Sequence, residues 1–429
     1  MRKLVKMSLA AAMMMGVGST ALQAEGMEVL SNITVDGQIR ARYEHVDAKD
    51  NGKSSANAYT NRLKLGVGAD LFGTDWLSAY AEMTNVSAIN DKYGAENANY
   101  DMVQDSKQTR LTQAYVDAKY GNTLLRVGRQ AVNLDNIRFI GTVDWRQMPQ
   151  TLDAIALVDN SIENLSLLAA YATQVNTITY NGSLDTRTLL LNASYSVMPE
   201  LKVTVYDYMI GSGTGAGNPA PGNEKTAGAG SDTYGIALTG NIAADDATTI
   251  NYRAEYARQS DPTMKRSGFS RADDIKADYY NLELGAKVEG FLIGAQYEVL
   301  GGHSFGSAHN SFQTPLATLH AHNGWADMFT ATPQEGLRDL SGHIGYTAKG
   351  FGTLKAIYHD YRTDSGSNDY GRELDIIFIK PCGLVKGLDL MAKYADYRGD
   401  DEAANTSAAA LANDTRKFWL MADYKFSTK

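Results

Sequence analysis

The chain has 429 residues, a formal net charge of −9 at pH 7, 44% hydrophobic residues and a single cysteine. A nucleic-acid partner is not expected of so acidic a chain, and one cysteine excludes an internal disulfide, a multi-cysteine metal site and a CxxCH haem site. Past the N-terminus no apolar run approaches the ~20 residues of a membrane-spanning helix, which excludes a helical membrane protein.

The N-terminus has the pattern of a secretory signal peptide. Three basic residues lie in the first six positions, an apolar run covers 9–17, and Ala24 ends a small-residue cleavage site, with 19–21 as a second choice. An N-terminal membrane anchor is the alternative, but the run is too short to span a bilayer. We therefore expect a signal peptide at 1–24 and the folded domain at 25–429.

After the signal, apolar and polar residues alternate with a period of two. Strict alternation predicts strands with one apolar and one polar face. A soluble sandwich would show the same pattern, but these segments run to ~10–12 residues and would cross a bilayer when tilted, whereas soluble strands average ~5–6. The predicted strands are 33–46, 58–72, 76–87, 109–120, 123–132, 152–159, 165–175, 185–198, 201–210, 232–243, 247–260, 277–288, 291–299, 339–349, 353–363, 370–380, 387–398 and 415–426.

The connections between these strands alternate in length. Very short turns, such as 121–122 and 199–200, alternate with long segments near 88–107, 133–151, 211–231, 261–275, 301–338 and 400–414. Short periplasmic turns, long extracellular loops and an even strand number are typical of outer-membrane barrels. The sequence predicts an all-β fold, a transmembrane antiparallel β-barrel of about 18 strands in a Gram-negative outer membrane. Its expected partners are membrane lipid, lipopolysaccharide and the barrel-assembly machinery.

A barrel of this size is too wide for side chains to fill its lumen, so water is expected to enter. The inward face carries both signs of charge in the early strands: Arg40, Arg42, Arg62, Lys64, Glu82, Asp117 and Arg126. Later strands are expected to add Arg253, Glu255, Arg258, Lys355 and Lys393. These charges either set selectivity through a transverse field or only hydrate the lumen and pair with one another. The early cations favour a passive path for small or anionic solutes.

Two stretches resemble the alginate-export family of outer-membrane porins. The first consists of Gly128, Arg129 and Gln130, then Gly141, Asp144, Trp145 and Arg146, then Asp153 and Ala154. The second, 312–327, resembles a loop found in shorter relatives. The resemblance implies a monomeric eighteen-stranded barrel whose loops fold into or over the pore. The family's alginate exporter has a strongly Arg-rich lumen, whereas this lumen is mixed and the chain is shorter, so a smaller or different solute fits equally well.

The first motif also brings three arginines and three aspartates into or beside one loop. They are Arg129, Arg138, Arg146, Asp135, Asp144 and Asp153. Bidentate Arg–carboxylate pairs could hold this loop inward, where it would constrict the pore. The alternative is that the network only pins the loop to the barrel wall.

Two rival functions remain open. The first is an outer-membrane serine hydrolase, because 302–306 matches Gly-x-Ser-x-Gly and would expose Ser304 between a strand and a helix. The second is a structural or receptor barrel plugged by its long loops. His320 and His322 could share a metal, but without Cys or an HExxH pattern we expect solvated histidines. Enzyme activity, metal and cofactor are therefore not expected.

Overall fold

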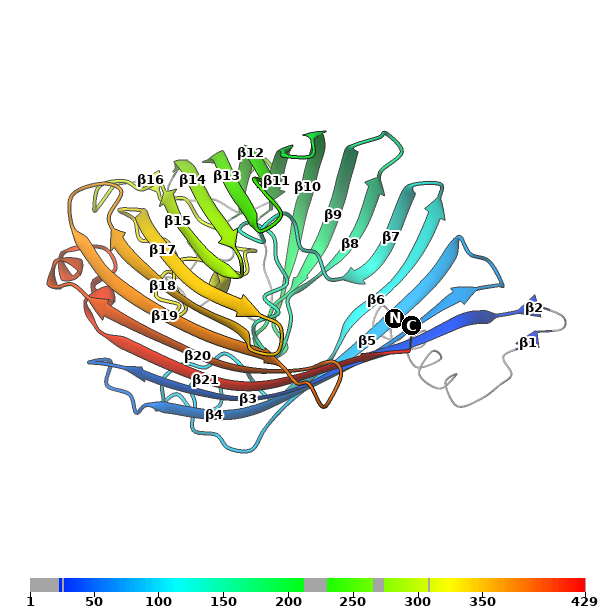
Figure 1. The fold of residues 1–429 in the computed structure, drawn as a ribbon, viewed down its shortest axis with the longest axis horizontal. Helices are drawn as coiled ribbons and strands as arrows, with labels where there is room; N and C mark the ends of the chain where they lie inside the picture. The colour runs from blue at the N-terminus through cyan, green and yellow to red at the C-terminus, as the bar shows by residue number, and fades with distance from the viewer. Residues whose placement is uncertain (1–22, 25–26, 212–229, 265–273, 308, 429) are drawn as a thin grey trace.

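The computed structural model describes residues 23–24, 27–211, 230–264, 274–307 and 309–428. All but the end of the predicted signal peptide lies outside the described residues. Within them, eighteen antiparallel strands form a closed barrel in which each strand pairs with its neighbours in the chain and the last pairs with the first (Figure 1).

The wall strands vary from eight to nineteen residues in length. They are β3 (Leu30–Ala48), β4 (Ala56–Leu71), β5 (Leu77–Ala88), β6 (Gln108–Tyr120), β7 (Thr123–Gln130), β8 (Thr151–Asp159), β9 (Leu165–Asn176), β10 (Ser183–Met198), β11 (Leu201–Ile210), β12 (Ser231–Ala243), β13 (Thr248–Ser260), β14 (Asp274–Val288), β15 (Phe291–Leu300), β17 (Leu337–Ala348), β18 (Gly352–Arg362), β19 (Asp369–Pro381), β20 (Leu388–Gly399) and β21 (Thr415–Ser427). The eighteen predicted strands are confirmed, with ends that agree to within three residues.

Few elements lie outside the wall. The two-residue strands β1 (Gln23–Ala24) and β2 (Met27–Glu28) pair with each other, and β16 (His309–Asn310) runs parallel to β14. Three short 3-10 helices, η1 (Leu319–Ala321), η2 (Asp401–Asn405) and η3 (Ala409–Ala412), lie in loops. None of the helices in the described segments is long and apolar enough to span a membrane.

Alternation along each strand divides the wall into two faces. Ile39, Leu282 and Ile344 are exposed on the outside, whereas Arg62 and Glu44 are fully buried inside. Lipid cannot satisfy free backbone N–H and C=O groups, and closure of the sheet pairs them all within the wall. The polar faces of the strands must then line the interior.

One predicted inward position is wrong. Arg258 lies three residues after the inward-facing Glu255 on β13, and side chains an odd number of positions apart point to opposite faces. It stands beside the exposed Tyr234 in the sheet register and lies 3.9 Å from Asp278. Arg258 was predicted to face inward because it is charged, without regard to its odd spacing from Glu255 along the strand.

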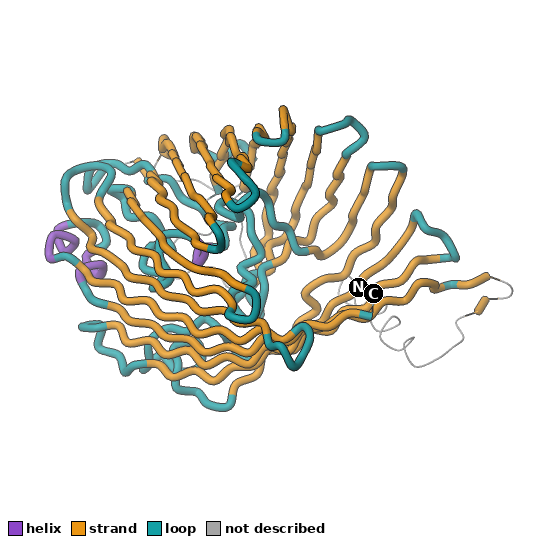
Figure 2. Tube along the Cα trace, in the orientation of Figure 1, coloured by secondary structure: helices purple, strands orange, loops and turns teal. Residues whose placement is uncertain are grey.

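Short turns lie at one end of the barrel and longer loops at the other, as predicted. Two of the long connections that contact the interior are residues 131–150 between β7 and β8, here loop A, and residues 301–336 between β15 and β17, here loop B (Figure 2). The main apolar cluster lies where these loops meet the wall. It includes Phe139 of loop A, Phe312 and Phe329 of loop B, and wall residues such as Tyr279.

Candidate functional site

Four cations form one patch on the inner wall. Arg40 and Arg42 are two residues apart on β3, and Arg62 and Lys64 are two residues apart on β4. Residues at such spacing share a face, and Arg40 lies directly opposite Arg62 in the sheet register. The three arginines are buried and Lys64 is nearly so. We call these four residues the basic patch.

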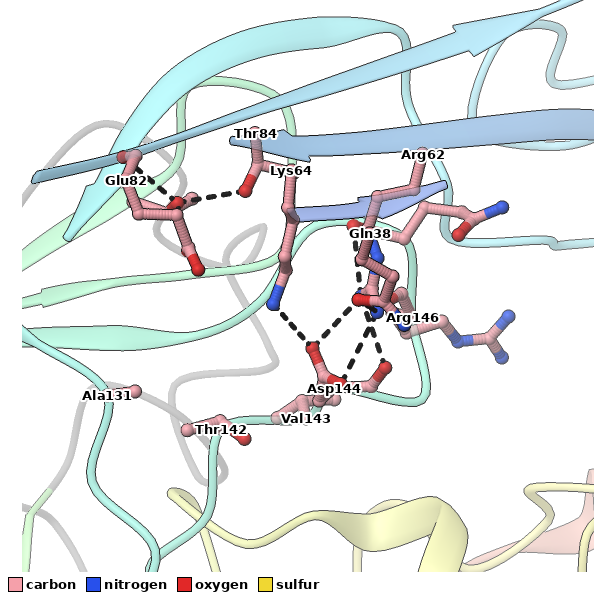
Figure 3. A network of polar contacts seen from close by, with 12 residues as sticks. Gln38, Arg62, Lys64, Glu82, Thr84, Ala131, Thr142, Val143, Asp144 and Arg146 are labelled. Atoms are coloured by element: carbon pink, nitrogen blue, oxygen red, sulfur yellow. Dashed lines mark hydrogen bonds and ion pairs between the residues drawn. The ribbon is translucent and has the colours of Figure 1, made fainter. Parts of the chain in front are cut away.

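Asp144 of loop A lies against the basic patch (Figure 3). Its carboxylate is 2.9 Å from both the Lys64 Nζ and an Arg62 nitrogen, and 3.8 Å from Arg40. The Asp144 side chain is still 45% exposed. Burial would raise the pKa of this carboxyl, but the charges of Arg62, Lys64 and Arg40 hold it well below its usual range.

The same arginines also bind the backbone of loop A. Arg40 donates to the carbonyl of Asp144 at 2.8 Å and Arg42 to that of Trp145 at 2.7 Å. Arg62 donates to the carbonyl of Arg146 at 3.2 Å. Buried carbonyls need donors, so the basic patch replaces the water that this segment would otherwise bind.

Arg146 points away from Asp144 and links the two loops. It donates to both oxygens of Glu44 on β3, at 3.1 and 3.2 Å, and lies 3.1 Å from Asp327 of loop B. Lys417 of β21 also reaches Asp327, at 2.8 Å. Burial disfavours the charged forms of both Arg146 and Asp327. The carboxylates of Glu44 and Asp327 nevertheless keep the pKa of Arg146 above its usual range. His320, Lys417 and Arg146 keep the pKa of Asp327 well below its usual range.

A second buried ion pair fixes the other end of loop A. Arg138 binds Glu298 of β15 through two hydrogen bonds of 2.9 and 3.1 Å, and it donates to the Asn323 side chain of loop B at 2.9 Å. This fork geometry is the strong, oriented form of an Arg–carboxylate contact. Loop A is therefore tied to loop B at both ends.

A second stretch of the inner wall, separated from β3 by β20 and β21, is acidic. Glu298, Asp339 of β17, and Glu373 and Asp375 of β19 are all buried and face inward. The backbone N–H groups of Trp325 and Ala326 donate to Asp375 and Glu373 at 3.1 and 2.7 Å. Cations on one side bind loop carbonyls while carboxylates on the other bind loop N–H groups, so the loops bridge two walls of opposite charge.

The remaining predicted wall residues lie apart from Asp144. Asp117 and Arg126 form a two-bond pair of 2.7 and 2.8 Å, and Arg126 covers the Tyr115 ring at 3.8 Å. Glu82 accepts from Thr112 at 2.6 Å. These side chains pair with close neighbours on their own stretch of wall and do not contact loop A.

The Gly-Arg-Gln motif lies where β7 ends and loop A begins. Gly128 has a φ of +135°, and a Cβ there would lie 2.2 Å from the carbonyl of Ala114. Arg129 pairs with Asp153 at 2.7 Å and donates to the carbonyl of Leu111 at 2.9 Å, and the Gln130 side chain donates to Ala154. The motif thus ends the strand and holds the wall together where the chain turns inward.

The arginines and aspartates expected to form a network in loop A take part in several separate contacts. Of the three arginines and three aspartates, only Arg129 and Asp153 pair with each other. Arg138 and Arg146 bind glutamates of distant strands, and Asp135 accepts from Asn192 and Tyr208. Bidentate Arg–carboxylate pairs do form, as between Arg138 and Glu298, but their carboxylates come from strands distant in the sequence.

The structure also shows where Ser304 and the histidines of loop B lie. Ser304 is exposed, and the described residues after it form a turn and the two-residue β16 rather than the helix of a nucleophile elbow. His320 is buried and bonded to Asp327, so the prediction of a solvated histidine is wrong there. Within the described residues no group of three or more potential ligands could hold a metal ion.

Sequence reasoning missed most of the partners of the loops. Asp105, from the 89–107 loop, binds Arg42 at 2.8 Å and accepts from the backbone of Gln147. Asp327 and the acidic wall were also missed. Strand parity could have found Asp339, Glu373 and Asp375, which occupy inward positions of predicted strands, but no sequence signal indicated Asp105.

Comparison with known proteins supports the fold and gives a family. A family model described as Alginate export matches residues 31–290, more than half of the chain. A search among curated proteins gave no match.

Solved structures match along nearly the whole chain. OpdK of Pseudomonas aeruginosa, solved with vanillate, is 13% identical over 93% of this chain and 100% of its own, with a TM-score of 0.69. OccAB2 of Acinetobacter baumannii is 15% identical over 93% and 98%, with a TM-score of 0.68. OccK8 (OprE) of P. aeruginosa is 15% identical over 94% and 100%, with a TM-score of 0.67. At these identities the likeness is one of fold.

Proposed function

The chain belongs to the alginate export family of outer-membrane barrels, and we propose that it is a channel for the passive passage of small anionic solutes. The observation that carries the proposal is the basic patch with Asp144 at the surface of loop A. Among the described residues, Arg40, Arg62 and Lys64 form ion pairs with two carboxylates, Asp144 and Asp423, which leaves one positive charge in excess. Fixed charges of this kind at a narrow point select for the opposite sign.

The interior is also open below the loops. A hollow of about 700 Å³ lies along the wall near the short turns, lined by Lys202, Arg253 and Glu283 among other polar residues. Lys202, Thr239, Arg253 and Glu283 stand side by side in the register of β11 to β14. A hollow with a polar lining at this end gives a solute that passes the loops a polar way out.

The size of the solute follows from the loops. Both loops A and B occupy the lumen, which favours a small molecule over a wide polymer strand. The vanillate of the OpdK structure is a small carboxylate, and a solute of that class fits the proposed charge and size.

A plugged receptor barrel is the second candidate, because the same two loops could close the lumen. Swelling of protein-loaded liposomes separates the two functions. We expect faster swelling with gluconate than with a neutral hexitol of equal size, and a smaller difference in Lys64→Gln. Lys355→Gln, which changes an inner-wall lysine of β18, is the control. Absence of swelling with every solute, from correctly folded barrel, would favour the plug.

A further inference from the structure

Three of the four tryptophans of the chain surround one lysine. The ammonium of Lys393, on β20, lies 3.7 Å from the ring centre of Trp325, 4.2 Å from that of Trp145 and 5.5 Å from that of Trp419. Trp145 belongs to loop A, Trp325 to loop B and Trp419 to β21. One positive charge thus contacts both loops beside the wall.

A histidine completes this cluster and fixes its orientation. The His320 Nε2 lies 2.7 Å from the Lys393 Nζ, and its Nδ1 lies 2.7 Å from Asp327. An ammonium donates and cannot accept, so Nε2 accepts and the proton sits on Nδ1, from which it is donated to Asp327. Burial lowers the pKa of His320 well below its usual value, which agrees with a neutral ring. The ring stacks on Trp145 with centroids 4.3 Å apart.

The lysine at the centre of the cluster is shielded from water, whereas Trp145 and Trp325 are partly buried. Lys393 is 4% exposed, and Trp419 is fully buried. The carboxylates of Asp375, Asp327 and Glu373 act on the ammonium from β19 and loop B, and Arg42 acts on it from the basic patch. Cation–π attraction is strongest when the cation is desolvated, so the contacts with the rings are made where they are most effective.

We propose that Lys393 is a positioning residue that clamps loop A to loop B and so sets the width of the constriction. Trp145 lies between Asp144 and Arg146 in the chain, so a displacement of its ring moves the carboxylate that faces the basic patch. The effect on transport rests on the proposed channel function, whereas the clamp itself is a property of the fold.

The test compares Lys393→Met, which keeps a long side chain and removes the charge, with Lys355→Met as the matched control. Tryptophan emission of the folded barrel in detergent reports on the clamp, and open-channel current noise in a planar bilayer reports on its effect. We expect Lys393→Met to shift the emission to longer wavelength and to increase the noise, and Lys355→Met to do neither. Lys393→Arg retains a cation that lies well over aromatic rings and is expected to stay close to the native protein in both readouts.

Native emission and native noise in Lys393→Met would overturn the clamp. So would equal effects of the Met and Arg variants, since packing volume rather than charge would then be responsible. A red shift in Lys393→Met, with no conductance from either protein, would support the clamp and contradict the channel. If Lys393→Met does not fold, Trp325→Phe gives the same test. We expect Trp325→Phe to increase the current noise, by less than Lys393→Met would. Native noise in Trp325→Phe would contradict the proposal.

Discussion

Asp144 is the residue at which anion selectivity is most directly tested. In Asp144→Asn the shape is retained but the basic patch loses one counter-charge. A unit charge ~5 Å away in water contributes about 0.8 kcal/mol, with opposite sign for anions and cations, so we expect the preference for anions over cations to rise about fifteenfold. Reversal potentials under a salt gradient measure this ratio, and high salt should reduce the difference. An unchanged or lowered anion preference would exclude Asp144 from the selectivity site.

The histidines of loop B make its position sensitive to acid. Burial, assisted by Arg138, lowers the pKa of His322 to about 3, and burial also lowers that of His320. In a detached loop both would protonate near pH ~6.5. The stability gained from keeping them neutral is therefore complete above that pH and is lost as the pH falls toward 3.

We accordingly expect a reversible red shift of tryptophan emission between pH 6.5 and 3, smaller in the His320→Gln/His322→Asn double variant. A transition on raising the pH above 8, with none on the acid side, would contradict this assignment.

At the scale of elements, the attachment of loop A depends on Arg138. Removing one partner of a buried pair leaves the other charge uncompensated, at a cost of about 3–5 kcal/mol. Arg138→Met should therefore speed hydrogen exchange in residues 134–146 and 319–328, as measured by mass spectrometry. Arg126→Met, which breaks the pair with Asp117 on the wall, is the control and should leave exchange in these loops unchanged. Slow exchange in the loops of Arg138→Met would show that this pair does not hold them.

The strands could be predicted because their pattern is local. Alternation needs only adjacent residues, so it indicated β8, with nine residues and the weakest pattern, as well as β4 with sixteen. The wall residues that bind the loops could not be predicted, because closure of the barrel decides which strands come to face each loop. Arg138 meets Glu298, 160 positions away in the chain, only when the sheet curves round to bring β15 opposite loop A. The motif residues were found from sequence, but the partners of Arg138 and Arg146 were not named.

At the scale of the whole molecule, the barrel separates stability from selectivity. Backbone pairing and the apolar outer face hold the wall in lipid, which leaves the inner face free to carry charge. Cations on β3 and β4 and carboxylates on β15, β17 and β19 then fix two loops between them. The seven residues named from sequence on the early strands all face the interior, and the four of the basic patch contact loop A.

Single-channel recording with a reversal potential under a salt gradient tests the central claim most directly. The account predicts discrete open steps from the refolded, heat-modifiable barrel, with a reversal potential that favours anions. A reversal potential that favours cations would contradict the role given to the basic patch. A complete absence of conductance from folded protein would contradict the channel itself.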